Sequence, residues 1–108
     1  MANIVYTRQL VARQLQPPFP SPLFVAAEGM RTVLLEVDVF VTPPASYFQL
    51  ALRAAGNDLI VAAIPSGGTE AFHQFQLHTA LDAYDILDVV SDATDVRLLI
   101  TGWELALP

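Results

Sequence analysis

The chain has 108 residues, which suit one domain, and 54% of them are hydrophobic while only 15% are charged, so a disordered polar tail is excluded. Its 11 acidic and 5 basic residues give a formal net charge of −6, which argues against nucleic acid and anionic membrane as partners. There is no cysteine, so disulfides, thiolate metal sites and cysteine nucleophiles are excluded.

The first 22 residues are predicted to form an extended N-terminal arm and a linker. Residues 3 to 15 alternate weakly, and Ile4, Val11 and Leu15 would also share a helix face, so the period does not separate strand from helix. Residues 16 to 22 contain four prolines, which lack amide donors and fix φ near about −65°. We therefore expect residues 1–22 to be an arm with a proline-rich linker, and residues 23–108 to be the folded domain. The N-terminus lacks a signal-peptide pattern, so a soluble, unprocessed chain is expected.

The clearest strand runs from Met30 to Val41, where apolar and polar residues alternate. One face carries Val33, Leu35, Val37, Val39 and Val41. The other face carries Thr32, Glu36 and Asp38. This face assignment predicts that the first set points into the core, and the two prolines after Thr42 are expected to end the strand.

Further strands are expected along the rest of the chain, separated by turns rich in Pro, Gly and Asp. They are residues 47–54, 59–64, 71–81, 86–90 and 96–107. A helix is the rival interpretation for 71–81. In the last strand, Leu99, Trp103 and Leu105 fall on the same face and are predicted to be buried. Gly102 indicates a bulge or a close backbone approach. Short strands at this spacing predict an all-β fold, an antiparallel, jelly-roll-like β-sandwich.

Candidate metal ligands are sparse in this sequence. His73 and His78 are the only histidines, and a spacing of five puts them on opposite faces of a strand, which disfavours a shared metal with Glu70. Five aspartates could offer oxygens to a cation, but turn and strand-end roles are favoured because no calcium-loop pattern is present. They are Asp82, Asp85, Asp88, Asp92 and Asp95.

Catalytic motifs are also lacking in the sequence. No serine sits in a nucleophile elbow, and the glycines after Ser66 lack the lysine of a phosphate loop. We expect no catalytic residue, cofactor or metal, and a protein that is not an enzyme. An alternative function is carbohydrate or receptor binding through Tyr47, Tyr84 and Trp103, although aromatic residues more often serve as core or interface anchors.

Two segments resemble a loose family of small structural proteins from tailed-phage virions. In that family a turn introduces a long valine-rich strand, which matches residues 24–38, and a final strand closes the sandwich, which matches residues 96–107. The resemblance spans residues 23–108. The turn residues Ala27, Glu28 and Gly29 depart from the family's Pro-Ala-Gly, and Trp103 stands where tyrosine is common. The resemblance implies a sandwich attached to a capsid or tail, often as a trimer, without catalytic residues.

These expectations combine into a hypothesis of a virion structural protein, either a capsid decoration subunit or a head-fibre-base subunit, with a tail or baseplate component as a further alternative. Its partners are expected to be other virion proteins and further copies of itself. The arm is predicted to contact a neighbouring subunit, with its two arginines pairing with the acidic segment 82–95 of that subunit. The predicted interface residues are Ile4, Val5, Tyr6, Arg8, Leu10, Val11, Arg13 and Phe19.

Overall fold

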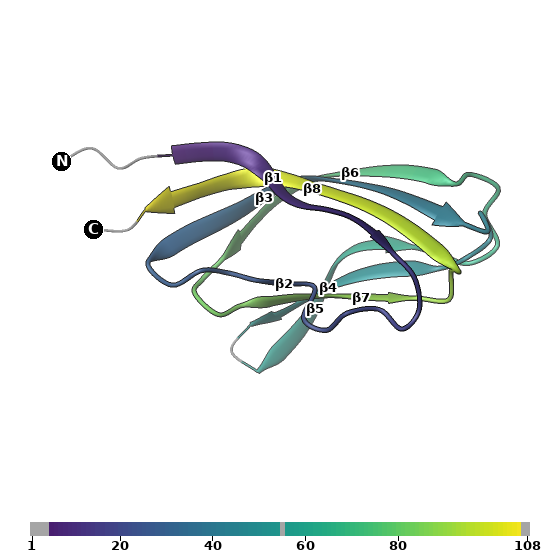
Figure 1. Cartoon of the computed structure of the whole chain (residues 1–108), viewed down its shortest axis with the longest axis horizontal. Helices are drawn as coiled ribbons and strands as arrows, with labels where there is room; N and C mark the ends of the chain where they lie inside the picture. Colours follow the sequence, from purple (N-terminus) through teal and green to yellow (C-terminus); the bar gives the residue numbers. More distant parts are fainter. Residues whose placement is uncertain (1–4, 55, 107–108) are drawn as a thin grey trace.

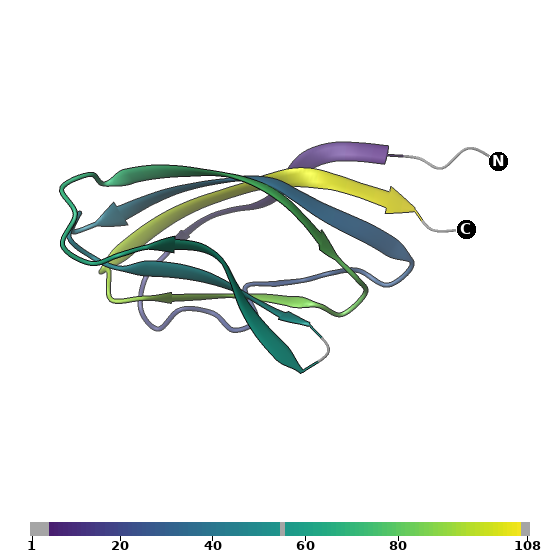
Figure 2. The same cartoon turned by 180° about the vertical axis from the view of Figure 1, so that it is seen from behind.

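The computed structural model describes residues 5–54 and 56–106, which form two four-stranded antiparallel sheets packed face to face (Figure 1). The strands are β1 (Val5–Leu15), β2 (Phe24–Val25), β3 (Met30–Thr42), β4 (Phe48–Ala54), β5 (Asn57–Ile64), β6 (Phe72–Leu81), β7 (Ile86–Ser91) and β8 (Asp95–Ala106). Sheet I has the order β1-β8-β3-β6, and sheet II has the order β2-β7-β4-β5. The opposite view shows the same two layers (Figure 2). The predicted all-β sandwich is confirmed.

The core lies between the two sheets and follows the alternation of the strands. In β4, Phe48, Leu50 and Leu52 are buried, as the pattern predicts, because successive side chains of a strand point to opposite faces. Segment 71–81 forms strand β6 rather than a helix, with Leu81 buried and Phe75 packed against the core. In the part of the chain that the structure describes, no helix is long and apolar enough to cross a membrane.

The expected N-terminal arm is a strand of the sandwich itself. The β1 backbone pairs with β8 from Val5, opposite Leu105, to Leu15, opposite Val96. The register shifts between Gln9 and Val11, which leaves one extra residue in β1. Such a bulge breaks the period of two, which explains why the alternation of this segment is weak. Residue 22 therefore does not separate an arm from the folded body.

A second bulge reverses part of the predicted face assignment of β3. The register of β3 with both of its neighbours shifts between Leu34 and Glu36. Before the shift, Leu34 and Thr32 are buried, while Val33, predicted to be inside, is partly exposed. An extra residue moves every preceding side chain to the other face, so only the second half of the strand follows the sequence prediction.

The face of β8 that was predicted to be buried is the outer one, so this prediction is wrong. Val96, Leu98 and Ile100 are buried, whereas Leu99 and Trp103 lie half-buried on the outside of sheet I. Both faces of this strand are apolar, so alternation alone does not decide which side is inside. The choice is made by pairing with β3, because a residue opposite an inward-pointing one points inward too.

Gly102 allows a close backbone approach, as its position in the sequence predicts. It pairs with Leu34 at the bulge of β3. A Cβ atom at this position would collide with the backbone oxygen of Val33 and would lie 3.0 Å from Leu10 Cδ1. Only glycine fits between these strands, because it has no Cβ atom.

Candidate functional site

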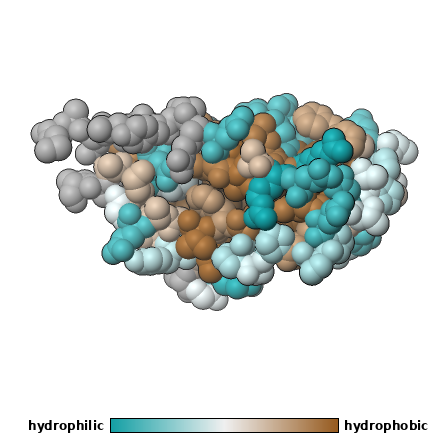
Figure 3. Space-filling view, viewed as in Figure 1, coloured by the Kyte–Doolittle hydropathy of each residue, from teal (hydrophilic) through white to brown (hydrophobic). Residues whose placement is uncertain are grey.

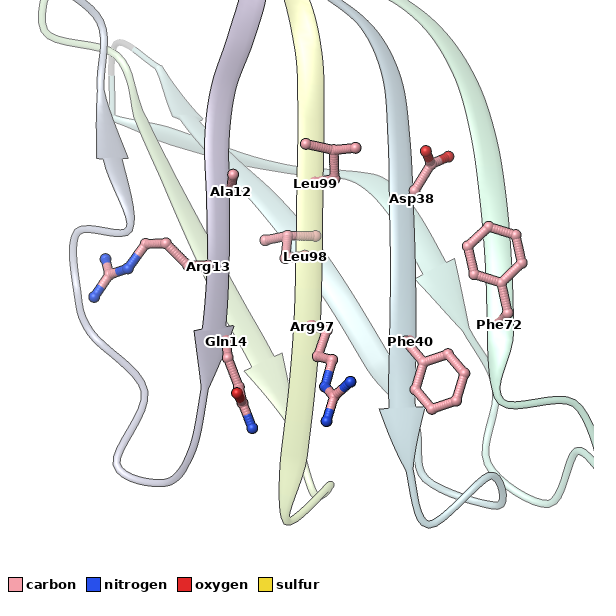
Figure 4. A pocket seen from close by; sticks show the side chains of 9 residues that line it. All are labelled: Ala12, Arg13, Gln14, Asp38, Phe40, Phe72, Arg97, Leu98 and Leu99. Carbon is pink, nitrogen blue, oxygen red and sulfur yellow. The ribbon is translucent and has the colours of Figure 1, made fainter.

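The outer face of sheet I contains a hollow with a volume of about 500 Å³ (Figure 4). The strand register places seven of its nine lining residues in two rows across the sheet, and the other two, Arg13 and Leu98, pair with each other between these rows. One row is Gln14, Arg97, Phe40 and Phe72, and the next is Ala12, Leu99 and Asp38. Each strand of sheet I therefore contributes at least one side chain to this surface, which we call the sheet I hollow.

Two aromatic side chains give the sheet I hollow an apolar wall. Phe40 of β3 and Phe72 of β6 are register partners, and they are 42% and 52% exposed. The solvent-facing side of an antiparallel sandwich normally carries polar residues, so adjacent exposed aromatic rings are unusual there. Contiguous exposed apolar surface of this kind is typical of an interaction site.

Opposite charges lie beside these rings. The Arg97 side chain is 66% exposed, and an ion pair joins its Nε to Asp95 Oδ2 at 3.6 Å. Asp38 lies diagonally from Arg97 on the neighbouring strand, and its Oδ1 is buried without a hydrogen-bond donor. Buried polar atoms usually have a partner, so the sheet I hollow contains an incompletely solvated carboxylate next to an exposed guanidinium.

The structure places three of the eight predicted interface residues within the chain's own fold. Val11 is buried in the core, and Leu10 and Phe19 pack against it. Arg13 is exposed and lines the sheet I hollow, so its contact with a neighbour stays a prediction. Ile4 and the side chains of Val5, Tyr6 and Arg8 lie outside the described residues.

The two histidines lie on opposite faces of β6, as their spacing predicts. His73 is half-buried on the inner face, with its Nε2 atom 3.0 Å from the backbone oxygen of Glu70, and His78 is exposed on the outer face. Among residues 5–54 and 56–106, no group of three or more His, Asp or Glu side chains is arranged to hold a metal ion.

The aspartates of segment 82–95 make structural contacts, four of them in turns or at strand ends and Asp88 within β7. Asp85 Oδ2 accepts a hydrogen bond from the Asp82 amide at 2.8 Å, and Asp92 Oδ1 accepts one from the Tyr47 amide at 2.8 Å. Asp88 accepts from the Ser21 hydroxyl at 2.9 Å, and Asp95 accepts from Gln14 Nε2 at 3.0 Å. Except at Asp88, these contacts match the turn and strand-end role that the sequence favoured.

The contact of Asp92 gives a test of this structural role. Asp92→Ala removes the acceptor of the Tyr47 amide and should lower the free energy of unfolding by about 1 kcal/mol, the net value of a typical hydrogen bond. Chemical denaturation measures this loss, and Glu70→Ala, which removes another exposed carboxylate, serves as the control. Equal stability of the two variants would contradict the role of Asp92.

The three aromatic residues proposed for sugar binding do not form one platform. Tyr47 lies beside Asp92 after the end of β7, whereas Tyr84 is exposed in the turn before β7 begins, so they occupy opposite ends of that strand. Trp103 lies half-buried on β8 of sheet I. The exposed aromatic pair is instead Phe40 and Phe72, which the sequence analysis missed. The sequence did contain an indication of this pair, because Phe40 is two residues after the outward-pointing Asp38 and therefore lies on the same face of the strand.

Tyr84 provides a prediction of pH dependence. A hydrogen bond with Glu28 raises the pKa of Tyr84 above 10.0. The contact therefore stabilises the fold below about pH 10 and is lost as the pH rises through the folded pKa. Alkaline titration by tyrosine absorbance, with Tyr84→Phe used to assign the signal, should show this midpoint falling in Glu28→Gln. An unchanged midpoint would exclude Glu28 as the cause.

Comparisons with known proteins identify similar folds in two viral structures. No protein-family model matches the chain, and no curated protein matches it. One similar chain comes from the structure of infectious bursal disease virus Gt strain, with a TM-score of 0.47, 18% identity, and coverage of 96% of this chain and 31% of that chain. Another comes from the Gx strain, with a TM-score of 0.49, 15% identity, and coverage of 97% and 31%. The protein thus spans about a third of the length of these solved chains.

Proposed function

We propose that this protein is a non-enzymatic structural subunit of a virus particle, most concretely a capsid decoration or head-fibre-base subunit of a tailed phage. It would act by binding other virion proteins through surface burial. The observation that carries this proposal is the sheet I hollow, where Phe40 and Phe72 expose adjacent rings on a face that is ordinarily polar. The sequence resemblance over residues 23–108 supplies the phage assignment.

The energetics of the exposed side chains suit a subunit that becomes covered. Burying a phenylalanine side chain contributes about 1.5 to 3 kcal/mol, so the two rings together could drive association. Further large apolar side chains are exposed elsewhere in the described residues. They include Val25, Leu59, Ile60 and Val90 on sheet II. On the side of the molecule seen in Figure 3, hydrophobic surface is interspersed with hydrophilic surface.

Composition of the virus particle tests the proposed function. Particles purified by density gradient from infected cells should contain this protein at a fixed ratio to the major capsid protein, measured by quantitative peptide mass spectrometry. Immunogold labelling should then place it on the head, whereas labelling of the tail would favour the baseplate alternative. Finding the protein only in the particle-free lysate would overturn the proposal.

A further inference from the structure

We infer that the sheet I hollow is the contact surface for a second copy of this chain, in a two-fold symmetric dimer in which each Arg97 pairs with Asp38 of the partner subunit. The inference names a partner within the proposed structural role and rests on that role. Three features support it: the diagonal placement of the two charges, the incomplete solvation of Asp38, and the local charge balance of this surface.

The first feature is geometric. Asp38 is opposite Leu99, and Phe40 is opposite Arg97, so these four residues form a rectangle on β3 and β8 (Figure 4). Arg97 and Asp38 occupy one diagonal, and Phe40 and Leu99 occupy the other. Consider a two-fold axis that lies in the contact plane, close to the line from Phe40 to Leu99. Rotation about this axis exchanges the positions of Arg97 and Asp38. It brings Arg97 over Asp38 of the partner subunit and the two Phe40 rings together. A two-fold contact requires such a self-complementary patch.

The second feature is the condition of the two charged groups before contact. Asp38 Oδ1 is buried without a donor, so part of the desolvation cost of this carboxylate is already present in the single chain. The exposed guanidinium of Arg97 has several donors, and among the residues that the structure describes its ion-pair partner is Asp95, at 3.6 Å. On contact, a rotation of the Asp38 carboxylate about its last side-chain bond presents an oxygen to the partner's Arg97 and gains a charge-assisted hydrogen bond, while the rings of Phe40 and Phe72 exclude water around it.

The third feature is local charge. The chain carries a net charge of −6, so two copies repel each other over most of their surfaces. The sheet I hollow is different, because Arg13 and Arg97 balance two acids: Asp38, which lines the hollow, and Asp95, which pairs with Arg97. Two acidic copies are therefore expected to repel each other little at this face.

Edge-strand pairing through β5 is the competing contact. Its residues Leu59 and Ile60 are 59% and 52% exposed on the free edge of sheet II. The register of β5 with β4 shifts at Val61, however, between the pairs Leu50 with Ala62 and Ala51 with Ile60. A bulge on an edge strand interrupts the row of free backbone groups and disfavours pairing with another chain. Sheet I is therefore the favoured face.

Charge reversal with rescue tests the inferred dimer. Sedimentation equilibrium of the purified chain should give a dimer mass, and Arg97→Glu and Asp38→Arg should each weaken association at least about 30-fold. The double variant Arg97→Glu with Asp38→Arg restores opposite charges and should recover dimerisation. Arg53→Glu makes the same charge change on sheet II and should leave the dimer intact. A double variant that stays monomeric would overturn the Arg97–Asp38 pairing.

A second pair of variants tests which apolar surface is covered. Phe40→Thr should dissociate the dimer, and Ile60→Thr, which replaces an exposed apolar residue of β5 by threonine, should not; circular dichroism checks that both remain folded. The reverse result would assign the contact to the β5 edge and overturn the inference. A monomeric or trimeric wild-type chain would also overturn it. None of these masses bears on whether the protein is present in purified particles, so failure of the proposed function is detected separately.

Discussion

Phe48→Ala is expected to lower the free energy of unfolding by about 4 kcal/mol. Phe48 is the largest fully buried side chain of the described residues and begins β4 in the middle of sheet II. Its truncation removes a ring from the space between the sheets, and the rigid packing of both layers prevents full collapse of the resulting cavity. Truncations of this kind cost about 3 to 5 kcal/mol.

Guanidinium denaturation followed by tryptophan fluorescence measures this loss. Phe40→Ala is the matched control, because it removes the same ring from an exposed position. At a protein concentration where both variants are monomeric, Phe40→Ala should change stability by less than about 1 kcal/mol. A loss below about 1 kcal/mol for Phe48→Ala as well would show that this side chain is not enclosed between the two sheets.

Gly102→Ala is expected to destabilise the protein by about 3 kcal/mol or to prevent folding. The added methyl group would collide with the backbone oxygen of Val33, which is held in the β3 ladder and cannot move without disturbing the bulge. Forcing extra atoms into a packed contact typically costs about 1 to 3 kcal/mol, and a backbone neighbour places this substitution at the upper end.

Gly68→Ala is the control for this substitution. Gly68 lies in the loop between β5 and β6, and a Cβ atom there would meet no atom within 4 Å. This variant should be neutral or stabilised by up to about 1 kcal/mol, because alanine restricts the unfolded chain. Thermal unfolding followed by circular dichroism compares the two. A Gly102→Ala variant as stable as Gly68→Ala would contradict the close approach of β8 and β3.

The candidate site was only partly predictable from the sequence. The placement of the two histidines on opposite faces of β6 and the turn or strand-end role of four aspartates followed from spacing alone, since both are properties of neighbouring residues. The sheet I hollow was missed because its rows combine residues from strands distant in sequence, such as Gln14 and Arg97. The one feature of the local sequence that indicated this site was an aromatic residue, Phe40, on the strand face that was predicted to point outward.

Local patterns in the sequence are enough to predict that the chain forms strands and where most of them begin and end. Alternation with a period of two, and prolines that interrupt hydrogen-bonded ladders, act over a few residues and need no knowledge of the rest of the chain. The inner face of β4 and the glycine at position 102 followed from the same local rules.

Which side of a strand faces the core depends on long-range pairing in β1, β3 and β8. Bulges in β1 and β3 shift parity within a strand, and β8 is apolar on both faces, so its orientation depends on pairing with β3. Pairing of β1 with β8 also made the N-terminal segment part of sheet I and created the outer surface where Phe40, Asp38 and Arg97 meet. The physical reason is that register is set by contacts between segments far apart in sequence, which no local pattern specifies.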